Sequence, residues 1–204
     1  MLDRMIFRAL APAAVFCVAW LCAGCAPTAR DAFSDPSIVQ RAAEKGDAQA
    51  QNDLGMRYFR GQGVPQSYAT AAAYYQLAAD QGNAWAQNNL GMMYVEGQGV
   101  PQDVARGAAL LQRSADQGFA MAQNNLGMMY VQGRVIPRND VKAAAFFQKA
   151  AAQGFPMAQF VLGEMYVVGQ GVPQDARKGC GLIRAAAANG ITGAREALNR
   201  YCAK

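Results

Sequence analysis

Apolar and polar positions follow a helical period along this chain, and the pattern itself recurs every 36 residues. Ala86, Leu90 and Tyr94 are spaced i, i+4, i+8, which places them on one side of a helix. A second buried stripe, spaced i, i+3, i+7, is predicted at Ala71, Tyr74 and Ala78 and again at Ala143, Phe146 and Ala150. Each unit therefore predicts two helices, and one such hairpin could not bury its apolar faces alone.

Glycines and prolines recur at intervals of 36 in one common phase. They are Gly55, Gly91, Gly127 and Gly163; Gly46, Gly82, Gly118, Gly154 and Gly190; and Pro65, Pro101, Pro137 and Pro173. Such a fixed period indicates a repeat architecture. The glycine beside the leucine of each first helix costs about 1 kcal/mol relative to alanine. Its recurrence predicts a neighbouring helix that lies too close for a β-carbon.

The segment between the two stripes carries residues that end one helix and begin the next. First helices are expected to end in a left-handed conformation at Gly61, Gly97, Gly133 and Gly169. Second helices are expected to begin after the N-cap residues Ser67, Asp103, Asn139 and Asp175. The loop reads Gln-Gly-Val-Pro-Gln in three units and Arg134-Val135-Ile136-Pro137-Arg138 in the third. The third loop is therefore a candidate for a specialised contact.

The motifs Leu-Gly-x-x-Tyr, Gly-x-Gly-Val-Pro and Ala-Ala-x-x-Gly at this spacing resemble the Sel-1-like repeat (SLR), a relative of the tetratricopeptide repeat. The resemblance covers nearly the whole chain after residue 45. It implies an all-α fold, a right-handed α-solenoid of antiparallel helix hairpins that acts as a protein-binding scaffold. We expect a solenoid over 36–204, with repeats at about 48–83, 84–119, 120–155 and 156–191 and a capping helix over 192–204.

By the same resemblance, the first helices line a concave face that binds a protein or peptide. Carried onto this chain, the predicted stripe comprises Gln49, Asn52, Met56 and Phe59; Trp85, Asn88, Met92 and Val95; Met121, Asn124, Met128 and Val131; and Met157, Phe160, Glu164 and Val167. The spacing i, i+3, i+7, i+10 places each set on one helix face. The flexible side chains of methionine suit adaptable binding of a peptide or a helix. Three buried asparagine amides would each need a hydrogen-bond partner, so we expect the asparagines to be exposed. Alternatively, the methionines and aromatic residues pack between hairpins.

The N-terminus carries the pattern of an export signal. Arg4 and Arg8 precede an uncharged apolar stretch over 9–23, which is short for a membrane span of roughly 20 residues. We therefore predict a signal peptide over 1–24. An uncleaved membrane anchor is the alternative.

The sequence Leu21-Cys22-Ala23-Gly24-Cys25 resembles the bacterial lipobox. That resemblance implies lipidation of Cys25, a linker over 25–35 and, because Ala26 follows, an outer-membrane lipoprotein that faces the periplasm. Ordinary cleavage near residues 23–29 would instead leave a soluble periplasmic or secreted protein.

Cys180 and Cys202 remain as one pair after this processing, which in an oxidising compartment predicts a disulfide. Facing residues of an antiparallel helix pair have numbers with a constant sum. The midpoint of this pair is residue 191, inside the predicted turn at 189–191. The disulfide would therefore tie the final helix to the preceding one.

The types of side chain in this sequence argue against catalysis. The chain has no histidine, which removes the commonest general base and most zinc chemistry. No serine is followed by lysine three residues later, as a Ser-x-x-Lys nucleophile requires. We therefore expect no enzyme activity, cofactor or metal. Some cysteine-rich SLR proteins resemble β-lactamases or penicillin-binding enzymes, and such an enzyme is the first alternative function.

The net charge of +5 is concentrated in the C-terminal part. Residues 26–133 carry 7 basic and 9 acidic groups, whereas residues 134–204 carry 10 and 4. This basic end is ordinary solvated surface or favours an acidic partner or anionic lipid headgroups. Nucleic acid is not expected, because the chain carries an export signal. A surface-exposed factor that binds host proteins is the second alternative, and the oligomeric state stays open.

Overall fold

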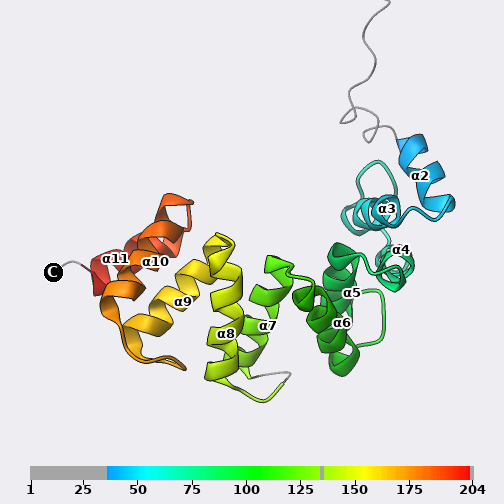
Figure 1. Ribbon diagram of the computed structural model, residues 1–204. Coiled ribbons are helices and arrows are strands. Elements are labelled where there is room, and N and C mark those ends of the chain that lie inside the picture. Colours follow the sequence, from blue (N-terminus) through cyan, green and yellow to red (C-terminus); the bar gives the residue numbers. More distant parts are fainter. Residues whose placement is uncertain (1–35, 134–135, 203–204) are drawn as a thin grey trace, which may run out of the picture.

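The computed structural model describes residues 36–133 and 136–202, and all regular secondary structure in these ranges is helical. In chain order the helices are α2 (Pro36–Glu44), α3 (Ala48–Arg60), α4 (Tyr68–Asp80), α5 (Ala84–Glu96), α6 (Val104–Asp116), α7 (Ala120–Gln132), α8 (Asp140–Ala152), α9 (Pro156–Val168), α10 (Ala176–Ala188) and α11 (Thr192–Tyr201). Each helix packs mainly on its neighbours in the chain. The hairpins follow one another along an arc that has α2 and α11 at its two ends (Figure 1). The predicted all-α solenoid is confirmed.

Several sequence predictions lie outside the described residues. These are the signal peptide, Cys25, the linker up to residue 35, and Arg134 and Val135 of the third loop. Among the helices that the structure describes, none is both long and apolar enough to cross a membrane.

The predicted helix boundaries are confirmed in each of the four hairpins. The Asp103 carboxylate accepts a hydrogen bond from the backbone N–H of Arg106 over 2.9 Å, and Ser67, Asn139 and Asp175 cap their helices in the same way. Gly97 ends α5 with φ +71°, and its N–H donates to the carbonyl of Met93. The equivalent glycines at 61, 133 and 169 are also left-handed.

The glycine in each first helix makes room for a large side chain from the second helix. A β-carbon on Gly55 would lie 2.8 Å from the ring of Tyr75, and one on Gly127 would lie 2.7 Å from the ring of Phe147. The sequence prediction that Tyr74 and Phe146 are the buried aromatics is therefore wrong by one residue. Steps of three and four both fit a helix, and the slot above the glycine decides which ring enters the core. Tyr74 and Phe146 instead stack on the half-buried rings of Tyr58 and Tyr130.

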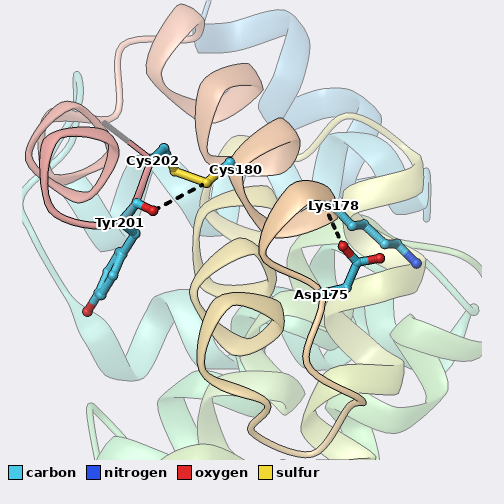
Figure 2. Close-up of a disulfide and its surroundings, with 5 residues drawn as sticks. All are labelled: Asp175, Lys178, Cys180, Tyr201 and Cys202. Carbon is cyan, nitrogen blue, oxygen red and sulfur yellow. Dashed lines mark hydrogen bonds between the residues drawn. A yellow bond between two sulfur atoms is a disulfide. The ribbon is translucent and has the colours of Figure 1, made fainter. Parts of the chain in front are cut away.

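A disulfide closes the C-terminal end of the solenoid. It joins Cys180 of α10 to Cys202 directly after α11, with a Cα–Cα distance of 5.8 Å. Figure 2 shows the bond beside the carbonyl of Tyr201, and it also shows Asp175 at the start of α10. Ala194 and Ala197 pack α11 against Ile183 of α10. The final helix is therefore held by apolar packing and by a covalent bond.

Candidate functional site

Three successive first helices, α3, α5 and α7, share one apolar cavity of about 300 Å³. Its lining residues are Met56, Phe59, Arg60, Tyr75, Trp85, Asn89, Met92, Met93, Glu96, Gln98 and Met121. Trp85 is 52% exposed, and its ring centroid lies 4.5 Å from that of Phe119. Five residues of the predicted stripe thus converge on one cavity, namely Met56, Phe59, Trp85, Met92 and Met121.

The other surface residues predicted for partner binding lie away from this cavity. Gln49 is exposed and donates to Asp53 over 2.9 Å. Met128 and Val131 are half-buried and pack against the cluster around Phe147 and Leu162. Phe160 is half-buried against the C-terminal cluster, and Glu164 is half-buried within reach of the positive charge of Arg200. The predicted stripe is therefore not one continuous surface.

The prediction that the three asparagines of the stripe are exposed for partner binding is wrong. Asn52, Asn88 and Asn124 are only 2%, 2% and 7% exposed. Asn89 donates to the Oδ1 atom of Asn52 over 3.4 Å, and Asn125 donates to that of Asn88 over 2.9 Å. The first two asparagines thus have the partners that burial demands, and these bonds join one repeat to the next.

The third asparagine lacks this partner. The Oδ1 atom of Asn124 is buried and accepts no hydrogen bond from the described residues. Val161 occupies the position in the fourth repeat that corresponds to Asn89 and Asn125, and a valine side chain has no donor. The polar connection between first helices therefore stops at the third repeat.

Helix geometry explains why five of the sixteen residues in the predicted stripe are buried, namely Asn52, Asn88, Val95, Asn124 and Val167. At 100° per residue, positions i and i+7 lie within about 20° of each other, whereas i+3 and i+10 are turned about 60° and 80° to one side. That rotation points Asn88 and Val95 into the structure, where Val95 is 9% exposed, as is Val167 at the equivalent position in α9. The surface-facing positions are instead i, i+4, i+7 and i+11.

In α5 these positions are Trp85, Asn89, Met92 and Glu96, and all four line the cavity. Sequence reasoning missed Asn89 and Glu96, as well as Arg60, the α3 counterpart of Glu96. The available signal was the spacing of four between Met56 and Arg60 and between Met92 and Glu96.

Tyr75 contributes from the second helix α4 to the lining of the same cavity. Its side chain is only 2% exposed. Burial raises the pKa of Tyr75 to about 12, against the opposing effects of the Arg60 charge and of a hydrogen bond with Asn89. The phenol therefore stays neutral and adds a hydroxyl–amide pair to otherwise apolar walls. In the described part of the chain, no group of three or more Cys, Asp or Glu side chains is placed to hold a metal ion.

The fold is that of a helical-repeat protein whose first helices α3, α5 and α7 share an apolar cavity. The Sel1 repeat matches residues 48–83, 86–119, 120–155 and 156–191, most of the chain. The chain belongs to the Sel1 repeat family. Members of this family generally act as protein-binding scaffolds, and no catalytic family is indicated.

The chain is similar to several solved structures. A Sel1 repeat protein from Oxalobacter formigenes is 38% identical over 83% of this chain and 49% of that one, with a TM-score of 0.75. This chain thus spans about half the length of that relative. The c5321 protective antigen of uropathogenic Escherichia coli, which displays an SLR fold, is 34% identical over 79% of this chain and 42% of its own, with a TM-score of 0.44.

Cysteine-rich protein B of Helicobacter pylori is 19% identical over 63% of this chain and 92% of its own, with a TM-score of 0.50. This likeness concerns the fold alone. The comparison with curated proteins finds no match.

Proposed function

We propose that this protein is a scaffold of the bacterial cell envelope that binds a segment of another protein on the face formed by α3, α5 and α7. The cavity shared by these helices carries the proposal. It combines a half-exposed tryptophan, a residue type that is enriched among the hot spots of protein interfaces, with methionine side chains that adapt to different partners. The repeat family supports the same class of function.

Two residues with nearly equal exposure allow a controlled test of the binding face. Trp85 lies at the cavity and is 52% exposed, whereas Leu77 lies on α4 outside the cavity and is 50% exposed. We expect Trp85→Glu to abolish capture of the partner from envelope extracts, whereas Leu77→Glu keeps it. Both variants should melt close to the wild-type temperature. Equal capture by both variants would reject this face as the binding site.

We further propose that lipid on Cys25 tethers the scaffold to the outer membrane on its periplasmic side. The lipobox-like sequence before Cys25 supports this location. A Cys25→Ser variant should move from the membrane to the soluble fraction, because the lipid supplies the membrane affinity. Cys180→Ser, which removes a distant cysteine, should leave the distribution unchanged. A Cys25→Ser protein that still fractionates with membranes would contradict the tether, and protease treatment of intact cells distinguishes a periplasmic from a surface position.

A further inference from the structure

Two opposite charges stand at the apolar cavity without pairing with each other. Arg60 is the last residue of α3 and Glu96 is the last residue of α5, so they hold equivalent positions in successive repeats. Both are exposed, and both line the cavity. No ion pair joins either residue to another side chain within the described ranges, whereas Arg138 and Asp140 do form one. The surface around the cavity therefore offers a cation and an anion at separate places.

The rest of the cavity selects an apolar side chain. Met56, Met92 and Met121 come from three helices, and the flexible thioether side chain of methionine adapts to different shapes. The ring of Trp85 is supported by Phe119, which makes it a rigid wall. A volume of about 300 Å³ is at the lower end of the range for ligand sites. The cavity therefore suits one or two side chains of a segment whose remainder lies across the surface.

We propose that the occupant is an extended segment of a partner protein with an aromatic or long aliphatic residue between two opposite charges. The apolar residue fills the cavity. An acidic residue on one side of it pairs with Arg60, and a basic residue on the other side pairs with Glu96. This inference rests on the proposed function and adds the chemistry of the partner. A polyanion fits less well, because Glu96 would repel it.

A peptide-display library with random positions on both sides of a central tryptophan tests the proposal on the purified protein. We expect the enriched peptides to place Asp or Glu on one side and Lys or Arg on the other. The Arg60→Glu variant should weaken binding of a selected peptide by up to roughly fivefold, as expected for exposed ion pairs. Replacing the acidic residue of that peptide by lysine should restore binding to the variant. Arg113→Glu, an exposed charge on α6 outside this cavity, should have no effect.

The outcomes separate this inference from the proposed function. Enriched peptides that lose binding in Trp85→Glu but show no preference for flanking charge would overturn the charge assignment and leave the binding face in place. The same holds for peptides that bind Arg60→Glu as tightly as wild type. A library with no enriched peptide, or with peptides that are indifferent to Trp85→Glu, would overturn both.

Discussion

The side-chain amide of Gln117 donates a hydrogen bond to the Oε1 atom of Gln87 over 2.7 Å. Gln87 is itself buried and donates from Nε2 to the carbonyl of Ala79 in the preceding repeat. The pair Gln81 and Gln51 and the pair Gln153 and Gln123 repeat the first contact at 2.7 and 2.9 Å. A glutamine directly after each of these second helices thus completes a buried amide in the first helix.

The fourth repeat breaks this rule and gives the first prediction. Asn189 takes the place of the glutamine, its shorter side chain bonds the carbonyl of Ala185, and the buried Oε1 atom of Gln159 is left without a donor. Asn189→Gln should supply the donor and raise the free energy of unfolding by about 1 kcal/mol. Urea denaturation measures the gain, with Asn189→Ala as the control that adds no donor. A glutamine variant no more stable than the alanine variant would contradict this explanation.

The second prediction compares two glycines on the same helix. A β-carbon on Gly179 would lie 2.6 Å from the carbonyl oxygen of Gly163, whereas one on Gly181 would meet nothing within 4 Å. Gly179→Ala should therefore destabilise the protein by about 1–3 kcal/mol through overpacking. Gly181→Ala should stabilise it by up to about 1 kcal/mol, because alanine favours the helix. Thermal unfolding of the two variants should shift in opposite directions, and shifts of the same sign would disprove the close approach of α9 and α10.

The arrangement of helices could be predicted because its determinants are local and repeated. Glycines such as Gly97 and N-caps such as Asp103 act within one turn of chain, so their positions in the sequence fix the helix ends. The candidate site could be predicted only in part. A rotation of the helix by one residue position, about 100°, decides whether Asn88 or Asn89 faces the surface. That rotation is set by what lies across the interface, namely Asn125 of the next repeat. Periodicity within a single helix does not contain that information.

The pairing of side chains in the core depends in the same way on two helices at once. Gly91 faces Gly107 and Leu111, whereas Gly55 faces Ala71 and Tyr75. Glycine at 107 thus accompanies leucine four residues later in α6, whereas the larger alanine at 71 accompanies the larger tyrosine four residues later in α4. The sequence shows the glycine of each first helix but not which residue fills the space beside it.

The third prediction concerns the pH dependence of stability. Burial raises the pKa of Glu164 above its ordinary value, and the charge of Arg200 opposes this shift. The folded protein therefore holds this proton more tightly than the unfolded chain does. The resulting stabilisation is complete below the ordinary pKa and is lost as the pH rises through the raised value. At neutral pH the ionised carboxylate is a net cost.

Glu164→Gln removes that cost and should raise the melting temperature at pH 7. The gain should shrink at pH 4, where the wild-type carboxyl is largely protonated. Glu96→Gln, which neutralises an exposed carboxylate of α5, serves as the control. A melting-temperature gain for Glu164→Gln that is the same at both pH values would show that burial of the charge is not its cause.

The last prediction concerns the disulfide at the C-terminal end. Cys180 and Cys202 are 22 positions apart, and closing a loop of this length stabilises the folded state by about 3 kcal/mol on the chain-entropy model. The double variant Cys180→Ala/Cys202→Ala should therefore unfold at lower temperature. Because Ala194 and Ala197 still pack α11 on the solenoid, the helical content at low temperature should stay near that of wild type. Wild-type protein purified without reductant should show no free thiol at these two positions, and its reduced form should melt together with the double variant. Two free thiols before reduction, or a double variant as stable as the oxidised protein, would show that the bond does not stabilise this end of the solenoid.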